Sequence, residues 1–184
     1  MPILNREPHC FPSDLLTQGP LAGGDRRWWV LHTKARQEKS VARDLLAQQV
    51  PYFLPQVEKT LLVRGRKQRS YIPLFTSYVF LYGSELERYR TLTTNRIGQV
   101  IDVKDQSQFH GDLAQVWKLI EAGAPLTVES RLTPGDRVRV RSGSLAGVEG
   151  TVTVRRSRCR LLVAVRLLQQ GVSIEIEDFL LEPI

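Results

Sequence analysis

The sequence predicts an α+β fold in two parts: an antiparallel sheet with helices on one face, followed by a small C-terminal all-β barrel. Two observations support this prediction. Before residue 123, segments with alternating apolar residues are interspersed with segments of helical period. After residue 134, only short alternating segments separated by glycines remain. We therefore expect a first domain at residues 26–122, a linker at residues 123–134 and a second domain at residues 135–184.

The first 25 residues are rich in residues that interrupt regular structure. They contain four prolines and the Gly23-Gly24 pair. We therefore expect a disordered leader over residues 1–25. This stretch lacks the apolar core of a secretory signal, and no apolar run in the chain approaches the ~18–20 residues that a membrane span requires. We expect a soluble, cytoplasmic protein with no membrane partner, and a monomer as the simplest state.

Apolar periodicity predicts each element of the first domain in turn. Pro51 ends the first helix, and Ser84 with Glu87 forms a capping box that opens the second. The expected elements are a strand at residues 27–33, a helix at 38–49, extended segments at 52–54 and 59–63, a strand at 77–82, a helix at 84–93, a strand at 99–103 and a helix from about 109 to 122.

The second domain is predicted from short alternating segments. Gly143, Gly147, Gly150 and Gly171 separate them, as expected for the corners of a small barrel. The linker before it contains glycine and two prolines without periodicity. The expected strands lie at residues 137–141, 149–154, 160–167 and 172–176.

The strand at residues 77–82 presents an aromatic face. Val79 and Leu81 are expected under the helices, which leaves Tyr78, Phe80 and Tyr82 on the opposite face. An exposed patch of this kind usually marks a partner site. The alternative is that a second sheet or the preceding loop covers it. Base stacking on RNA is disfavoured because the glycines and leading base of the RNA-recognition signature are absent.

Positive charge is concentrated in the first domain. The chain carries a net charge of +7, and residues 26–104 contain fifteen basic and six acidic residues. A turn around Gly65 gathers several of the basic residues. Either it is a solvated hairpin tip, or it contacts the phosphate backbone of DNA or RNA. The basic residues of this hairpin are Lys59, Arg64, Arg66, Lys67 and Arg69.

Nothing in the sequence indicates catalysis. The three histidines are His9, His32 and His110, and none has metal-ligand spacing or a nearby nucleophile. Phosphate-binding, dinucleotide-binding and nucleophile-elbow motifs are absent. The two cysteines, Cys10 and Cys159, are far apart in the sequence. We expect no enzyme activity, no cofactor and no metal.

Three motifs, in this order, resemble those of the NusG family of transcription factors. Residues 28–33, Trp-Trp-Val-Leu-His-Thr, resemble the family's opening WYVL strand. Residues 73–81, Pro-Leu-Phe-Thr-Ser-Tyr-Val-Phe-Leu, look like its LFPGYVFV strand. Residues 138–152 follow the pattern V-x-V-x-x-G-x-L-A-G-x-x-G-x-V, which resembles the KOW motif. Together the matches span about residues 26–184.

The resemblance implies an NGN domain, a linker and a five-stranded KOW barrel. It also implies a transcription elongation or antitermination factor that binds the clamp helices of the largest RNA polymerase subunit through the aromatic face of its NGN domain. The barrel would recruit a partner, such as ribosomal protein NusE or Rho. The alternative function is a ribosome- or RNA-binding KOW protein.

Individual residues match family positions. Phe75, Tyr78 and Phe80 match the clamp-binding aromatic residues. His32 and Thr91 fall where the specialised RfaH type contacts the polymerase, and Lys34 matches a DNA-facing position of that type. The KOW partner-binding positions correspond to Leu145, Leu168 and Gln170.

The stretch around the basic turn resembles the RfaH type more closely than a housekeeping NusG. Residues 63–67, Val-Arg-Gly-Arg-Lys, carry this likeness. We therefore expect a specialised paralog. The C-terminal domain is rich in valine, isoleucine and glycine at strand spacing, so we expect a stable barrel rather than one that switches to helices.

Overall fold

The computed structural model describes most of the chain, which divides into two compact units, Met1–Gln106 and Ser107–Ile184. The sequence placed the boundary after residue 122, so the last helix expected in the first domain belongs almost entirely to the second unit. The described residues are 7–18, 24–63, 66–123, 125–129, 131, 135–155, 158–177 and 180–184.

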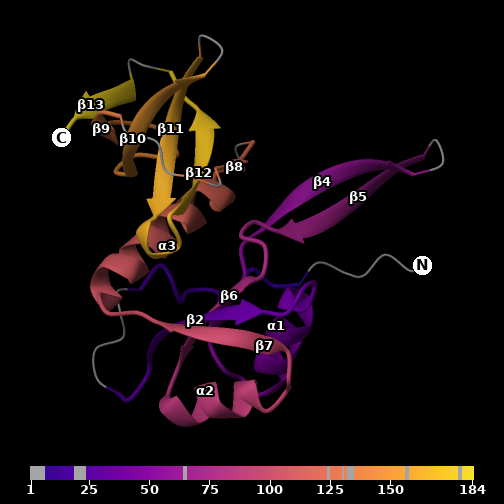
Figure 1. The fold of residues 1–184 in the computed structure, drawn as a ribbon. Coiled ribbons are helices and arrows are strands. Elements are labelled where there is room, and N and C mark those ends of the chain that lie inside the picture. The colour runs from indigo at the N-terminus through magenta and orange to yellow at the C-terminus, as the bar shows by residue number, and fades with distance from the viewer. Residues whose placement is uncertain are drawn as a thin grey trace. The chain divides into compact units, whose positions relative to one another are not determined.

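The first unit is built on an antiparallel sheet with the strand order β1-β3-β6-β2-β7. The strands are β1 (Cys10–Phe11), β2 (Arg27–Thr33), β3 (Tyr52–Phe53), β6 (Tyr78–Gly83) and β7 (Ile97–Asp102). The helices α1 (Glu38–Ala47) and α2 (Glu85–Leu92) lie on one face of this sheet. The remaining strands, β4 (Gln56–Val63) and β5 (Arg66–Pro73), pair with each other in a separate ribbon, which projects from the sheet in Figure 1.

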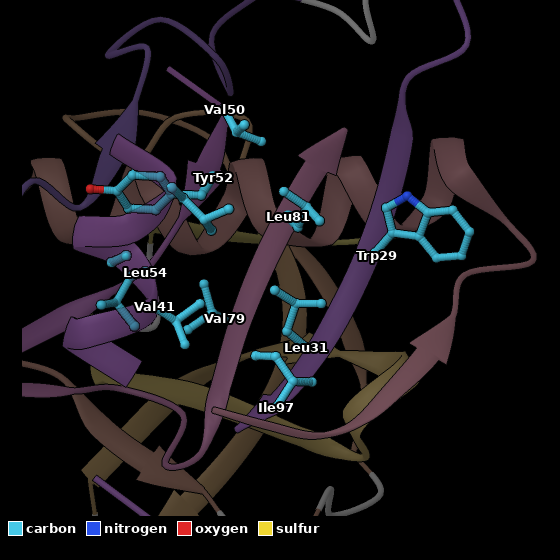
Figure 2. Close-up of a cluster of buried hydrophobic side chains, with 11 residues drawn as sticks. Trp29, Leu31, Val41, Val50, Tyr52, Leu54, Val79, Leu81 and Ile97 are labelled. Atoms are coloured by element: carbon cyan, nitrogen blue, oxygen red, sulfur yellow. The ribbon is translucent and has the colours of Figure 1, made fainter. Parts of the chain in front are cut away.

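The core of the first unit lies between the helices and the sheet. Val79 and Leu81 of β6 are fully buried and pack in one cluster with Val41 of α1 and Leu31 of β2 (Figure 2). This confirms that Val79 and Leu81 lie under the helices. Ser84 and Glu87 form the expected capping box at the start of α2.

Residues 7–18 are ordered, although the sequence placed them in a disordered leader. Cys10 and Phe11 pair with β3, and Leu15 and Leu16 are buried. These apolar side chains and the backbone pairing hold the segment in place. Neither could be predicted from the local sequence, in which prolines interrupt any regular pattern.

The second unit is an antiparallel sheet with the order β13-β9-β10-β11-β12-β8, together with helix α3 (Gln106–Glu121) after its first residue. Among the described strands, β13 and β8 form the two edges. The sheet is therefore open, and the closed barrel that the sequence predicted is not observed. The elements are β8 (Thr127–Glu129), β9 (Arg137–Val140), β10 (Glu149–Arg155), β11 (Arg158–Val165), the short helix η1 (Arg166–Leu168), β12 (Gln170–Glu175) and β13 (Leu181–Pro183).

β8 lies where the sequence predicted an unstructured linker. Arg160 of β11 is buried and donates hydrogen bonds to the hydroxyls of Ser173 at 3.0 Å and Thr127 at 2.7 Å. Ser173 in turn donates to the Glu129 carboxylate at 2.6 Å. This polar network supports the antiparallel backbone pairing of β8 with β12.

Candidate functional site

The aromatic face of β6 contains both buried and half-exposed rings. Cross-strand pairing places Phe80 opposite Val30 of β2 and Phe53 of β3. The rings of Phe53 and Phe75 lie 6.0 and 5.9 Å from that of Phe80, measured between centroids. Phe75 and Phe80 are almost completely buried.

The prediction of an exposed aromatic patch on this face is therefore wrong for Phe80, and Phe75, which the family resemblance assigned to clamp binding, is buried as well. Phe75 lies in the loop that precedes β6, and its ring packs against Phe80 in an edge-on arrangement. The covering loop was the alternative that the sequence left open. Tyr82 is also buried, with its ring centroid 5.2 Å from that of Trp28.

His32 and Tyr78 form the accessible part of this face. They are directly opposite each other on β2 and β6, their ring centroids are 5.1 Å apart, and both side chains are half-exposed. The structure thus brings together two of the residues that the sequence assigned to polymerase binding, next to the buried rings.

The turn before Tyr78 is fixed by a buried carboxylate. Ser77 adopts a positive φ of 66°, a conformation that costs a non-glycine residue about 1–2 kcal/mol. Its N–H donates to Oε1 of Glu38 at 2.7 Å, and its carbonyl accepts from the N–H of Thr33 at 2.8 Å. These bonds hold the strained turn and so set the position of Tyr78.

Thr91 is not available for a surface contact in this structure. It is buried, and its hydroxyl donates to the carbonyl of Glu87 at 2.9 Å within α2. The exposed side chains of this helix include Leu86 and Tyr89.

The basic residues of the predicted hairpin lie on the β4–β5 ribbon. Lys59, Lys67 and Arg69 are exposed, and Arg69 forms an ion pair with Glu58 at 3.3 Å. Arg64 lies outside the described residues, as does the side chain of Arg66. The major groove of DNA admits a two-stranded ribbon, so exposed cations on such a ribbon can reach phosphate oxygens.

Lys34 lies apart from the ribbon, at the end of β2. It is exposed, and its ammonium donates to the side-chain oxygen of Asn95 at 2.7 Å.

The three KOW positions lie in two connections of the second unit. Leu145 is half-buried in the turn between β9 and β10, while Leu168 in η1 and Gln170 at the start of β12 are also half-buried.

Two polar side chains of α3 that the sequence pattern did not indicate accept hydrogen bonds from backbone N–H groups. Asp112 is buried, and its carboxylate accepts from the N–H of Arg166 at 2.9 Å. The side-chain oxygen of Gln115 accepts from the N–H of Glu149 at 2.6 Å. Beside these contacts lies a cavity of about 450 Å³. Asp112 and Gln115 are three residues apart on a predicted helix and therefore share one face, which is the sequence feature that could have indicated them.

Among the described residues, no group of three or more His, Cys, Asp or Glu side chains could hold a metal ion. Burial, together with the nearby charges of Glu7 and Cys10, raises the pKa of Tyr52 to about 12, so this phenol stays neutral. Within the same described part, no helix is long and apolar enough to cross a membrane.

A half-exposed aromatic pair and an exposed basic ribbon are features of proteins that bind macromolecules through their surfaces. Comparison with family models gives a match to "NusG: Transcription termination factor nusG" over residues 26–118, half of the chain. The chain belongs to the NusG family. Members of this family are transcription factors rather than enzymes and bind RNA polymerase, and membership supports a general role in transcription elongation.

Solved structures and curated proteins were also compared. A crystal structure of the MjSpt4:Spt5 complex in conformation B is 13% identical in sequence, covers 85% of this chain and 96% of its own, and has a TM-score of 0.26. No curated protein matches the chain.

Proposed function

We propose that the chain is a transcription elongation and antitermination factor that binds the clamp helices of the largest RNA polymerase subunit through its first unit. The observation that carries this proposal is the half-exposed pair His32 and Tyr78, within the family-matched residues. Half-exposed aromatic side chains on a rigid sheet are frequent anchors of protein interfaces. In this proposal, Phe75 and Phe80 stabilise the face from within, and Thr91 has no direct contact.

The test is capture of core RNA polymerase, free of nucleic acid, by the full chain. We expect His32→Ala and Tyr78→Ala each to weaken capture by about tenfold or more, the loss typical of an interface anchor. Tyr71→Ala is the matched control, because Tyr71 is a half-exposed tyrosine on the ribbon. Substitution of Phe80 is unsuitable, since removing a buried ring destabilises the fold itself. Wild-type capture by both His32→Ala and Tyr78→Ala would exclude the clamp-helix site.

The ribbon is assigned to the backbone of DNA or RNA near the bound polymerase. Lys59, Lys67 and Arg69 are exposed positive charges among its described residues. Contacts of this kind weaken as salt rises, because each releases bound counterions. We therefore expect a Lys67→Gln, Arg69→Gln double variant to show a shallower salt dependence of DNA binding than the wild-type chain.

The second unit is proposed to act as the KOW domain and to recruit ribosomal protein NusE or Rho through Leu145, Leu168 and Gln170. The sequence around the ribbon further supports a specialised paralog of the RfaH type. Binding to ribosomal RNA without any binding to polymerase would instead favour the RNA-binding alternative.

A further inference from the structure

The first residue of the β4–β5 ribbon is hydrogen-bonded to residues of the N-terminal segment. Gln56, the first residue of β4, is 2% exposed. Its backbone N–H donates to Nδ1 of His9 at 3.0 Å, and its side-chain amide donates to the carbonyl of Glu7 at 2.9 Å. Both hydrogen bonds connect the base of the ribbon to residues 7–9.

The same segment is attached along the chain that leads into the ribbon. The N–H of Leu54 donates to the His9 carbonyl at 2.7 Å, and the hydroxyl of Tyr52 donates to the Pro8 carbonyl at 3.3 Å. Cys10 and Phe11 continue this contact as strand β1, paired with β3. Residues 7–11 therefore follow the whole approach to β4.

The segment also connects this approach to a helix. The carboxylate of Glu7 accepts from Nε of Arg43 on α1 at 2.7 Å, and the Glu7 side chain is only 14% exposed. By contrast, β4 and β5 pair only with each other among the described strands. A two-stranded ribbon without a third strand has little stiffness of its own, so its base determines its direction.

We infer that residues 7–11 are a brace that fixes the direction of the β4–β5 ribbon relative to the sheet of the first unit. The brace lies before residue 26, where the family match begins. The contribution of the brace to binding rests on the proposed nucleic-acid role of the ribbon. A ribbon already held in one direction loses less conformational entropy when it contacts a phosphate backbone.

The critical contact is the acceptor that His9 offers to Gln56. His9→Ala removes this acceptor, whereas His9→Asn restores a side-chain oxygen at a similar distance from the backbone. We expect NMR order parameters of the ribbon amides Lys59, Lys67 and Arg69 to be about 0.85 in the wild-type chain and in His9→Asn, and below about 0.6 in His9→Ala. Amide exchange at Gln56 should accelerate by roughly tenfold in His9→Ala only.

The amides of Leu31 and Val79 in the sheet serve as the internal control and should keep their order in all three chains. A ribbon that stays rigid in His9→Ala would overturn the inference. A loss of order shared equally by the ribbon and the sheet would overturn it too, because His9 would then only stabilise the fold. If His9→Ala does not fold, Gln56→Met, which removes the bond to Glu7, should loosen the same ribbon amides and leave the sheet unchanged.

Measurement of DNA binding distinguishes a failure of the brace inference from a failure of the proposed nucleic-acid role of the ribbon. With a short DNA duplex as the probe, weaker binding by both His9→Ala and the Lys67→Gln, Arg69→Gln double variant supports both. A ribbon loosened in His9→Ala, with wild-type DNA binding by both variants, supports the brace and contradicts the nucleic-acid role of the ribbon.

Discussion

Glu87 illustrates how a single carboxylate can organise one corner of the first unit. It accepts from the N–H of Ser84 at 2.7 Å and pairs with Arg26 at 2.6 Å. Burial alone would raise the pKa of Glu87, but the Ser84 and Arg26 hydrogen bonds together hold it below its ordinary value. The charged form is thus the one that the folded chain stabilises.

The first prediction concerns the pH dependence of this contribution. Because the folded pKa of Glu87 is lowered, its stabilisation is complete above the unfolded pKa and is lost as pH falls through the folded pKa. We expect the urea midpoint of the wild-type chain to exceed that of Glu87→Gln at neutral pH, and the difference to shrink at about pH 3. An undiminished difference at that pH would show that packing, rather than charge, accounts for the effect.

Neighbouring residues on one strand also show what sequence can and cannot predict. Alternation correctly placed Val79 and Leu81 under the helices, because side-chain direction along a strand is a local property. It could not show that Phe80 is covered while Tyr78 remains half-exposed. That difference depends on the ring of Phe75, which packs against Phe80 from the loop that precedes β6.

At the scale of elements, the periodic segments were predicted, whereas the short strands β1 and β8 were not. α1 and α2 carry their own apolar stripe, β6 carries its own alternation, and α2 also has a capping box, so local residues specify these elements. β1 and β8 have two and three residues and no period. They exist because distant partners offer hydrogen bonds: β3 and the ribbon base for β1, and the Arg160–Ser173 network for β8.

Two glycines of the second unit make a matched test of how its elements pack. A Cβ at Gly150 on β10 would lie 2.4 Å from the carbonyl oxygen of Leu162 on β11, whereas a Cβ at Gly111 on α3 meets nothing within 4 Å. We expect Gly150→Ala to destabilise the chain by about 1–3 kcal/mol. Gly111→Ala should stabilise it by about 0.5–1 kcal/mol, because alanine favours the helix. Urea unfolding measures both, and equal effects of the two would contradict the β10–β11 pairing described above.

At the scale of the whole molecule, charge and apolar contact are divided between two features of the first unit. The sequence places a net excess of basic residues in residues 26–104, and the structure places Lys59, Lys67 and Arg69 on a projecting ribbon (Figure 1). The accessible aromatic contact is smaller than the sequence suggested, since it consists of His32 and Tyr78. Long-range charge can accelerate encounter with an anionic partner, and the small aromatic pair can then supply specificity.

The division of the chain gives the last prediction. The sequence ended the first domain after residue 122, but the second unit begins at Ser107. It therefore includes Asp112 and Gln115 of α3. Their side chains accept hydrogen bonds from the N–H groups of Arg166 and Glu149, respectively.

A fragment of residues 107–184 keeps both hydrogen bonds, whereas a fragment of residues 123–184 leaves the two backbone N–H donors without these acceptors. We expect the longer fragment to be more stable by about 2 kcal/mol or more, since each such bond contributes about 1 kcal/mol. Urea unfolding of the two fragments, with Asp112→Ala in the longer one as the control, measures this. Equal midpoints would place α3 outside the second unit, whereas a higher midpoint that Asp112→Ala lowers would establish the helix as part of it.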